Sequence, residues 1–378
     1  MPADKCRLCN QSFYNESILY YENMPKAAQF LPDENEIKNE VGVNLDIRQC
    51  MGCGLVQLSN DPVSYFREVI RAVGISPEMQ KFRSKQFKEF INEHSLENKK
   101  IVEIGCGQGE YLKVIGESNV DAYGLEYSEK LVSQCKASGL KVFNGFIEDA
   151  NYRISDCNYD AFYILNFLEH IPDINGILMG IRNNLNDGAV GIVEVPNFDM
   201  ILKKNLFSEF TTDHLYYFTK NTLISTLSKN GFEILSCDEV WYDYIISARV
   251  KKRKRVELTH FYNFQEKLKD DLHKYIDSFE KNKVAIWGAG HQALAVICMT
   301  EIKDKIKYIL DSAPFKQGKY SPATHIPIVA PEKLHTGSID AVIVIAASYS
   351  DEVAKIIREK YSKEISVAIL RDFGLEEV

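Results

Sequence analysis

Two Cys-x-x-Cys pairs near the amino terminus could hold a metal ion. Cys6 and Cys9 form the first pair, and Cys50 and Cys53 form the second. Each pair can fold into a tight turn that presents two thiolates, and four sulfurs complete the closed tetrahedral shell of a structural zinc ion. A redox pair or four unpaired thiols are the alternatives, but a doubled pair is more typical of zinc than a single one. We therefore expect a structural zinc site, with a hairpin or loop between the pairs.

A glycine turn directly after a predicted buried strand could hold a small anionic ligand. Residues 101–109 read IVEIGCGQG, so Glu103 is followed by glycines at Gly105, Gly107 and Gly109. Glycines let the backbone approach a ligand closely, and the apolar spacing from residue 110 onward predicts a helix that begins at this turn. The free N–H groups and the positive dipole end of that helix favour a carboxylate or another anionic group.

Three further predicted strands lead into polar residues that could complete such a ligand site. These strands span residues 122–126, 141–143 and 159–165. The first ends in Glu126, at the place where doubly wound nucleotide-binding sheets grip ribose hydroxyls. Glu148 and Asp149 follow the second, and either carboxylate could accept a hydrogen bond from an adenine amino group. Asn166 opens the block NFLEHIPD, which is expected at the carboxyl ends of the strands, where such sheets bind ligands.

These four signals, taken in order, resemble the successive motifs of the class I S-adenosylmethionine-dependent methyltransferases. The resemblance implies that the fold is α/β, with a doubly wound Rossmann-like core, and that the cofactor is S-adenosylmethionine. The carboxylate of its methionyl part suits the helix end at the glycine turn. A single glycine-rich turn also fits dinucleotide-binding enzymes, so an NAD-binding oxidoreductase stays an alternative.

A further block, TTDHLYYFT at residues 211–219, narrows the resemblance. Together with the doubled cysteine pairs, the Glu-His-Ile-Pro-Asp block and a second α/β segment at the carboxyl end, it is similar to the nucleotide-sugar C-methyltransferases that modify 4-keto-deoxyhexoses. This resemblance covers nearly the whole chain. It implies a nucleotide-linked keto-deoxysugar as the small-molecule substrate, and a carboxyl-terminal domain that helps to bind it.

The chemistry of such a substrate indicates which side chains would act. A proton on the carbon next to a carbonyl can be removed when a base is positioned and the enolate oxygen is stabilised. His214 is the expected base, because the pKa of histidine lies near neutral pH and the carboxylate of Asp213 could orient the ring. His170 is a second candidate, although it could instead order the cofactor pocket. Tyr217 could donate to the enolate or flank the sulfonium ion.

Five residues are candidates for contacts with the sugar nucleotide. Lys316 and Lys319 could neutralise a diphosphate as flexible point charges, and Tyr320 belongs to the same segment. Tyr65 lies in the connection after the cysteine pairs, where the family has several tyrosines. Arg249 stands in the segment that corresponds to a His-Gly-Gly-Ser-x-Arg motif of the family, of which this chain keeps the serine and the arginine.

The length of 378 residues, with 45% hydrophobic side chains, predicts several domains. We expect a zinc-binding domain at 1–75, a methyltransferase domain at 76–255 and a smaller Rossmann-like α/β domain at 256–378. The tail repeats the strand and glycine-turn pattern at residues 284–293 (VAIWGAGHQA), and Asp311 ends the next predicted strand. An amphipathic helix is predicted over residues 257–281.

Composition excludes some functions and leaves others open. The net charge of −8 argues against bulk attraction to nucleic acid, and the absence of a long apolar run argues against membrane insertion. Without the pattern of a signal peptide, the expected location is the cytoplasm. The family's Tyr-x-Glu-His is Thr-x-Asp-His here, so the sugar, the methylated position and a carbon or oxygen acceptor stay open. A non-enzymatic nucleotide-sugar-binding protein is the remaining alternative.

Overall fold

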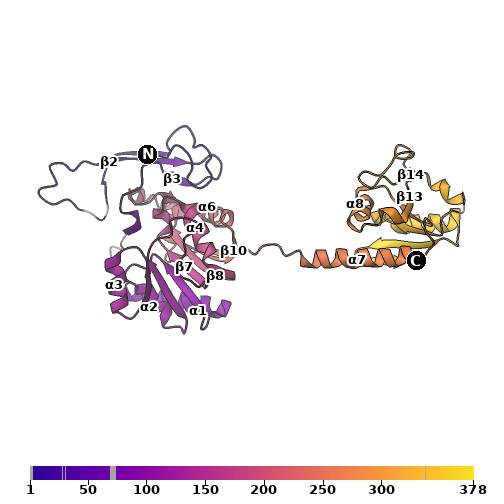
Figure 1. Ribbon diagram of the computed structural model, residues 1–378. Helices are drawn as coiled ribbons and strands as arrows, with labels where there is room; N and C mark the ends of the chain where they lie inside the picture. Colours follow the sequence, from indigo (N-terminus) through magenta and orange to yellow (C-terminus); the bar gives the residue numbers. More distant parts are fainter. Residues whose placement is uncertain (1–2, 28, 30, 69–73, 337) are drawn as a thin grey trace. The chain divides into compact units, whose positions relative to one another are not determined.

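The computed structural model describes residues 3–27, 29, 31–68, 74–336 and 338–378. Its contacts divide the chain into two compact units, Met1–Lys254 and Arg255–Val378 (Figure 1). The predicted border after residue 255 lies beside this division. Residues 1–75 and 76–255 fall within one unit, so the division into three domains stays a prediction. Among the residues described, no helix is long and apolar enough to cross a membrane.

A seven-stranded sheet forms the centre of the first unit, in the order β10-β11-β8-β7-β4-β5-β6. The strands are β4 (Lys100–Ile104), β5 (Asp121–Glu126), β6 (Lys141–Asn144), β7 (Tyr159–Leu165), β8 (Leu185–Pro196), β10 (Phe232–Val240) and β11 (Ile245–Lys252). Strands β4 to β8 pair in parallel, whereas β11 pairs antiparallel with β8 and with β10. The α/β class and the doubly wound Rossmann-like sheet are confirmed, and β4 to β7 lie within one residue of their predicted bounds.

The order of the strands fixes where a ligand can bind. From β4 the chain moves outward to β5 and β6 on one side, and it then returns to β7 and β8 on the other side. The carboxyl ends of β4 and β7 therefore form a topological switch point, where open α/β sheets leave a crevice for ligands. The glycine turn follows β4 and the NFLEHIPD block follows β7, so both predicted motifs meet at this point.

Helices cover both faces of this sheet. They are α1 (Pro77–His94), α2 (Glu110–Gly116), α3 (Glu129–Ala137), α4 (Ile174–Asn183), α5 (Phe198–Lys203) and α6 (Lys220–Lys229). Helix α1 begins cleanly because Pro77 occupies its first position and the Ser76 side chain accepts a hydrogen bond from the Met79 N–H at 3.1 Å. Residues of α1, α2 and α3 share one buried cluster, and residues of α4 and α6 share another on the opposite face.

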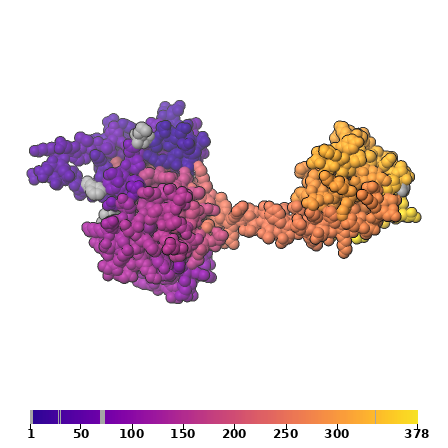
Figure 2. Space-filling model, viewed as in Figure 1, coloured from indigo at the N-terminus to yellow at the C-terminus, as the bar shows by residue number. Residues whose placement is uncertain are grey.

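The amino-terminal segment forms a small antiparallel sheet in the order β1-β2-β3-β9. Its strands are β1 (Leu19–Met24), β2 (Val43–Gln49), β3 (Val56–Leu58) and β9 (Tyr216–Tyr217). The hairpin of β1 and β2 fills the interval between the two cysteine pairs. Leu8, Phe13 and Leu55 belong to the same buried cluster as residues of α4 and α6, and the indigo segment lies against the magenta core in Figure 2. Since β9 comes from the block at 211–219, the cysteine segment and this block are held together.

The second unit has its own six-stranded sheet, in the order β14-β13-β12-β15-β16-β17. The strands are β12 (Val284–Trp287), β13 (Ile306–Leu310), β14 (Ile328–Val329), β15 (Ala341–Val344), β16 (Ser366–Arg371) and β17 (Gly374–Glu377), and the helices are α7 (Thr259–Asp277), α8 (His291–Met299) and α9 (Ser350–Ile356). All pairs except β16–β17 are parallel, as expected for a Rossmann-like fold. Helix α7 is the predicted amphipathic helix, and it buries Leu268, Leu272, Tyr275 and Ile276.

Candidate active site and metal centre

Glu126 orders the glycine turn at the end of β4. Its Oε2 accepts a hydrogen bond from the Gly107 N–H at 2.8 Å, and its Oε1 accepts one from the Ser128 N–H at 2.9 Å. The Gly105 N–H donates to the carbonyl of Leu125 at 2.9 Å, which ties the turn to β5. Burial raises the pKa of Glu126, and these backbone N–H groups oppose that shift. The carboxylate therefore lies at the predicted position and still has lone pairs for a further donor.

The glycines are required by conformation and by space. Gly105, Gly107 and Gly109 have φ angles of 72°, 53° and 73°, in the left-handed region. A Cβ atom on Gly105 would come within 2.8 Å of the Phe167 ring, whereas a Cβ atom on Gly107 would meet no described atom within 4 Å. The turn thus packs on one side and borders open space on the other. A ligand can approach its backbone there.

A small pocket lies beside the turn. Its lining residues are Arg67, Ile104, Gly105, Leu125, Glu126, Tyr127, Gly145, Phe146, Ile147, Phe167 and Ile177. The guanidinium of Arg67 lies 4.8 Å from the ring centre of Phe66 and 5.3 Å from that of Phe146. The carboxylate of Glu126 and the ring of Phe146 border this cavity, whose volume of about 10 Å³ is room for one water molecule, so a nucleoside could bind here only if the pocket opened. Phe146 and Arg67 were not predicted as site residues. Only the aromatic ring of the one and the positive charge of the other could have suggested them from the sequence.

The predicted partners of the adenine amino group lie just outside this pocket. The exposed carboxylate of Glu148 forms an ion pair with Arg67 at 3.2 Å. The Asp149 carboxylate accepts a hydrogen bond from the Asn151 N–H at 2.6 Å. Neither residue lines the pocket. Their role in binding adenine stays a prediction.

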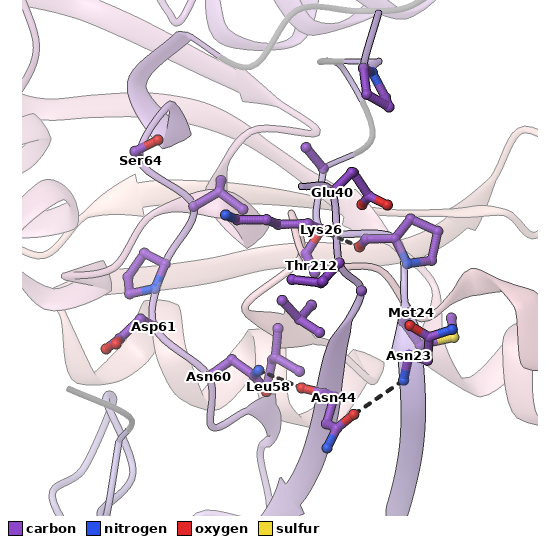
Figure 3. Close-up of a pocket in the computed structure, with 18 of the residues that line it drawn as sticks. Asn23, Met24, Lys26, Glu40, Asn44, Leu58, Asn60, Asp61, Ser64 and Thr212 are labelled. Carbon is purple, nitrogen blue, oxygen red and sulfur yellow. Dashed lines mark hydrogen bonds between the residues drawn. The ribbon is translucent and has the colours of Figure 1, made fainter. Parts of the chain in front are cut away.

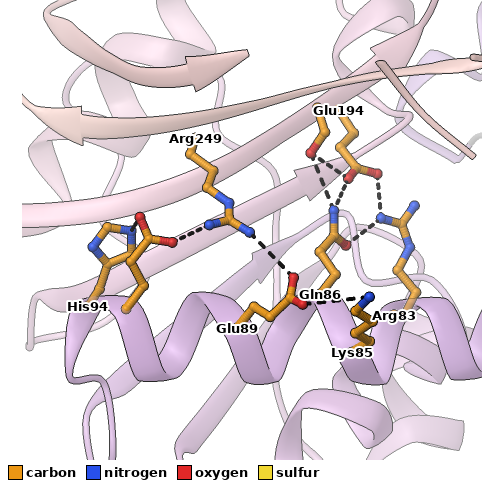
Figure 4. A network of polar contacts seen from close by, with 9 residues as sticks. Arg83, Lys85, Gln86, Glu89, His94, Glu194 and Arg249 are labelled. Atoms are coloured by element: carbon orange, nitrogen blue, oxygen red, sulfur yellow. Dashed lines mark hydrogen bonds and ion pairs between the residues drawn. The ribbon is translucent and has the colours of Figure 1, made fainter. Parts of the chain in front are cut away.

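A buried arginine on α1 supplies positive charge near the glycine turn. Arg83 is fully buried, forms an ion pair with Glu194 of β8 at 2.5 Å and donates to Gln86 at 2.7 Å (Figure 4). Its guanidinium lies 5.0 Å from the ring centre of Tyr111, in the first turn of α2. Within the described chain, Nε and Nη2 of Arg83 have no hydrogen-bond partner. Two orphaned donors beside the helix start fit a ligand that carries a carboxylate.

Two more of the predicted cofactor residues are buried at the switch point. Glu103 of β4 accepts a hydrogen bond from the Tyr163 hydroxyl at 3.0 Å, which places its carboxylate beneath the turn. Asn166 follows β7 with a left-handed φ of 48°, and its N–H donates to the carbonyl of Glu194 at 2.9 Å. The Asn166 Oδ1 atom is buried and finds no partner among the residues described. It can therefore accept a hydrogen bond from a ligand in the crevice.

The two predicted histidines meet in space. His170 ends the 3₁₀ turn Leu168–His170 after β7, and its ring centre lies 4.8 Å from that of His214. The Nδ1 atom of His170 is 2.8 Å from the carbonyl oxygen of Asp213. Because a carbonyl can only accept, Nδ1 carries the proton and Nε2 keeps a lone pair. Burial lowers the pKa of His170, and burial together with His170 lowers that of His214 to about 3. Both rings are therefore neutral at pH 7, and the lowered pKa makes His214 a weaker base than the near-neutral histidine that we expected.

Asp213 has a different partner from the expected one. Its Oδ1 accepts a hydrogen bond from the Tyr65 hydroxyl at 2.5 Å, and its carbonyl receives His170. No hydrogen bond joins the side chains of Asp213 and His214 in the part of the chain that the structure describes. Asp213 therefore links Tyr65 and His170 to the block at 211–219. Our expectation that its carboxylate orients the His214 ring is not met. Tyr65 lines the larger pocket, and its role in substrate binding stays a prediction.

Tyr217 stabilises the same block. It lies buried in β9, where its hydroxyl is 3.4 Å from the Thr211 carbonyl and accepts from the Thr211 N–H at 3.2 Å. Its ring centre is 6.4 Å from that of His214. Burial raises its pKa. The hydroxyl thus closes the loop that carries His214, and a direct role of Tyr217 on an enolate stays a prediction.

A second, larger pocket adjoins this block (Figure 3). It lies between the β1–β2 hairpin and the segment after β3, and its residues include Asn23, Met24, Lys26, Glu40, Asn44, Leu58, Asn60, Asp61, Ser64, Tyr65 and Thr212. Tyr65 and Thr212 place one end of the pocket directly beside Asp213. The larger pocket approaches the histidines through Tyr65 and Thr212, and neither His170 nor His214 lines it.

The other predicted substrate residues lie elsewhere. Arg249 of β11 forms ion pairs with Glu93 and Glu89 of α1, on the outer face of the sheet (Figure 4). In the second unit, Lys316 forms an ion pair with Asp311 at 2.8 Å, whereas Lys319 and Tyr320 are exposed. The structure does not bring Arg249 to the histidines. A role in substrate binding for these four residues stays a prediction.

The glycine turn of the second unit is bound by its own acid. Asp311 Oδ2 accepts a hydrogen bond from the Ala289 N–H at 2.8 Å and also meets the Lys316 ammonium group. A Cβ atom on Gly288 would come within 2.4 Å of the carbonyl oxygen of Ile345, so this turn packs tightly against the neighbouring loop. The acid that would grip a ribose in a dinucleotide-binding fold is thus engaged within the protein.

The four predicted zinc ligands converge. Their sulfurs all lie within 4.8 Å of one another, with Cys6 and Cys53 at 3.6 Å and Cys9 and Cys50 at 3.4 Å. Sulfurs around a tetrahedral zinc ion are about 3.8 Å apart, and those of a disulfide are about 2 Å apart. The Gln57 amide donates to Cys6 Sγ at 3.1 Å, as a partner of a metal-bound thiolate does. Four thiols in this geometry fit a structural zinc ion.

Two protein families each match a part of the chain, and the two parts together cover most of it. One, described as a methyltransferase domain, matches residues 79–237, and the other, described as a C-methyltransferase C-terminal domain, matches residues 247–369. The first contains the glycine turn, Glu126 and both histidines. The second begins in β11 and covers nearly all of the second unit.

Two proteins with similar sequences are methyltransferases. The C-methyltransferase NovU of Streptomyces niveus is 22% identical over 389 residues, which covers 93% of this chain and 91% of that protein. A ubiquinone biosynthesis O-methyltransferase of Methylococcus capsulatus is 32% identical over 133 residues, which covers 34% of this chain and 55% of that protein. The similarity to the first extends over both units, whereas the second corresponds to part of the chain.

Solved structures resemble the core at low identity. An S-adenosylmethionine-dependent methyltransferase from Clostridium acetobutylicum has a TM-score of 0.39 and 14% identity, covering 46% of this chain and 92% of that chain. The magnesium protoporphyrin IX methyltransferase of Synechocystis, with bound SAH, has a TM-score of 0.39 and 15% identity, covering 50% of this chain and 97% of that chain.

Proposed function

Because the chain belongs to a C-methyltransferase family and is a class I S-adenosylmethionine-dependent methyltransferase, we propose that it methylates a carbon atom of a nucleotide-linked keto-deoxysugar. The observation that carries this proposal is the pair His170 and His214. Both rings are neutral, they lie together beside the donor crevice, and Phe167 connects them to the glycine turn. A carbon acceptor requires a base at this place, because its proton must leave before the methyl group can be accepted.

Residues of the chain hold the donor in this proposal. Glu126 binds the ribose hydroxyls, Phe146 packs on the adenine and Arg83 pairs with the methionyl carboxylate. When bound, S-adenosylmethionine supplies an electrophilic methyl group on sulfur. Asn166 closes the crevice between the donor and the histidines. The fit rests on the orphaned atoms of Arg83 and Asn166 and on the open space beside Gly107.

The acceptor reacts at the histidines. His214 removes the proton from the carbon next to the keto group, and His170 holds its own ring in one tautomer through the Asp213 carbonyl. Tyr65 borders the larger pocket, which would take the rest of the acceptor. Carboxylates outnumber Lys26 in that pocket, so the diphosphate needs other cations. Binding of a diphosphate by Lys316, Lys319 and Tyr320 rests on the resemblance alone.

We propose that the four cysteines bind a zinc ion. The ion would be structural, because four cysteines leave no open coordination position for chemistry. It would fix the small sheet in which β9 pairs with β3, and so the block that carries His214. Reduced thiols at this site agree with a cytoplasmic location, which we propose for the protein.

The test is incubation with S-adenosylmethionine and a panel of nucleotide-linked keto sugars in heavy water, followed by mass spectrometry. We expect a gain of one methyl group, and deuterium exchange next to the keto group when the donor is omitted. His214→Asn should lose both, whereas the exposed His260→Asn should keep both. Methylation without exchange, or exchange that survives in His214→Asn, would overturn the role of this base.

The match to an O-methyltransferase favours a hydroxyl acceptor as the second candidate. Such a reaction would need no ketone and would show no carbon-bound exchange. The same panel, supplied with reduced 4-hydroxy sugars, therefore separates the two acceptors. Methyl transfer to the reduced sugars at the rate seen with the ketones would favour oxygen.

A further inference from the structure

A buried carboxyl group at the acceptor end of the site has no assigned role. Glu169 belongs to the turn Leu168–His170 and is 1% exposed. Its carbonyl accepts a hydrogen bond from the Leu215 N–H at 2.8 Å, which fixes it against the block that carries His214. Its Oε2 atom has no hydrogen-bond partner within the described ranges. A buried carboxyl oxygen without a partner is costly and indicates a ligand.

Two imidazole rings lie close to this carboxyl group. Glu169 Oε1 lies 3.8 Å from His170 Nε2, and one side-chain atom each of Glu169, His170 and His214 lie within 4.8 Å of one another. Groups that surround one oxygen atom at hydrogen-bond distance are about 4.6 Å apart, whereas nitrogen and oxygen ligands of zinc are about 3.4 Å apart. The 3.8 Å between Glu169 and His170 lies between these two spacings, so the distances fit either a metal ion or an oxygen atom of the acceptor. The buried, unpartnered Oε2 of Glu169 and the two neighbouring imidazole rings are the observations that carry the inference.

The protonation of these groups agrees with that geometry. Burial raises the pKa of Glu169 to about 8, so its carboxyl group is mostly protonated at neutral pH. The titratable groups around it are His170 on the same turn, His214 and Asp213 on the neighbouring block, and Tyr244, whose pKa is raised mainly by burial and partly by Glu169. No cation among the residues described pairs with Glu169. A carboxylic acid kept neutral by an apolar site can donate a hydrogen bond to an oxyanion.

We propose that Glu169 is a further catalytic residue, whose carboxylic acid donates a hydrogen bond to the keto oxygen of the acceptor while His214 takes the proton from the adjacent carbon. This inference rests on the proposed function. The carbon–hydrogen bond breaks, its proton goes to His214, and its electron pair forms the enolate whose oxygen faces Glu169. When that carbon forms its bond to the methyl group, the carbon–sulfur bond breaks, sulfur keeps the pair, the carbonyl is restored and His214 releases its proton to water.

The kinetic test compares two variants of Glu169 with a matched control. Glu169→Ala should lower kcat/KM about 100- to 1000-fold, as the loss of one oxyanion donor does. Glu169→Gln should recover part of that loss, because an amide N–H can still donate. The wild-type rate should fall above about pH 8, where Glu169 ionises, and the Gln variant should lack this fall. Glu209→Gln, at a half-buried carboxyl group that accepts from Tyr244, should leave the rate and its pH dependence unchanged.

A second measurement needs no sugar. Difference infrared spectra of the intact protein should show a protonated carboxyl band at pH 7 that titrates near pH 8 and is missing in Glu169→Gln, while calorimetry with S-adenosylmethionine shows that the variant is folded. If no keto sugar reacts with wild type, the proposed function fails and this band still decides the state of Glu169. An ionised Glu169 at pH 7, full activity in Glu169→Ala, or a zinc or manganese ion that binds wild type but not Glu169→Gln would each overturn the inference.

Discussion

Burial sets the protonation states of the residues at the acceptor end, with opposite signs for acid and base. The pKa of His214 falls from 6.5 to about 3, and that of Glu169 rises from 4.5 to about 8. Both side chains are mostly neutral at pH 7 for the same reason, because burial, complete for Glu169 and partial for His214, disfavours the charged form. One neutral group can accept a proton and the other can donate a hydrogen bond. In the proposed reaction, enolate formation from a ketone uses one group as the base and the other as the hydrogen-bond donor.

The buried imidazole predicts a loss of stability in acid. Below pH 6.5 the unfolded chain protonates His214 and the folded protein does not, so stability falls as the pH drops from 6.5 towards 3. If the pKa shift applied in full, the free energy of unfolding would fall by about 1.4 kcal/mol for each pH unit in this range. We expect a smaller fall because His214 is only half-buried. In a Trp287→Phe background, urea unfolding followed by Trp241 fluorescence should show a weaker acid dependence in His214→Asn. An identical dependence in both proteins would contradict the buried, neutral ring.

Removing the Glu126 carboxylate should lower the affinity for S-adenosylmethionine. Its two oxygens order the turn through Gly107 and Ser128 and face the small pocket. Hydrogen bonds to a charged group contribute about 1.5 to 3 kcal/mol, so Glu126→Ala should weaken S-adenosylmethionine binding at least about 10-fold in calorimetry. Glu129→Ala, in the exposed first turn of α3, is the matched control. Equal affinities for the two variants would place the ribose elsewhere.

Helix α1 is fixed to the sheet by a buried ion pair and by a surface pair. Arg83 and Glu194 are fully buried, whereas Arg249 meets two largely exposed glutamates (Figure 4). Removing one member of a buried pair leaves an uncompensated charge, but surface pairs contribute little. The two arginines therefore offer a matched comparison on one helix.

Arg83→Met should lower the free energy of unfolding by about 3 to 5 kcal/mol. Arg249→Met should lower it by no more than about 1 kcal/mol. The measurement is urea unfolding of unit Met1–Lys254 followed by Trp241 fluorescence. Similar losses in both variants would show that the Arg83 pair is open to water.

The sequence predicts the elements of the core much better than the contacts between them. Strands β4 to β7 are short apolar runs bounded by turns, and these patterns are local. Phe146, Arg83 and Glu169 gain their importance from burial beside segments distant in the chain, which no local pattern contains. The sequence neighbours Asp213 and His214 also suggested a pair, yet the backbone directs Asp213 to Tyr65. His170 and His214 were proposed from the resemblance and from the near-neutral pKa of imidazole, and no local pattern predicted that their rings would meet.

If zinc binds the four cysteines, its removal should affect the block that carries His214. Strand β9 pairs with β3 directly after the second cysteine pair, so the loss of the ion should loosen the block at 211–217. Wild type should contain one zinc ion per chain by elemental analysis, and Cys53→Ser should lose it together with methyl transfer. Cys298→Ser, an exposed cysteine of the second unit, should change neither. Full activity in zinc-free Cys53→Ser would contradict this connection.

The second unit shares the family match but has its own core. Its glycine turn is held by Asp311, and its sheet is complete without residues of the first unit. The residues proposed to bind the donor, Glu126, Phe146 and Arg83, all belong to the first unit.

The most direct test of carbon methylation is to supply S-adenosylmethionine labelled with carbon-13 in its methyl group, together with a nucleotide-linked keto sugar that reacts, and to record the product by NMR. We expect the labelled methyl carbon to couple directly to a ring carbon next to the keto group. A labelled methyl group bonded to oxygen, or no label in any sugar, would contradict the proposed reaction.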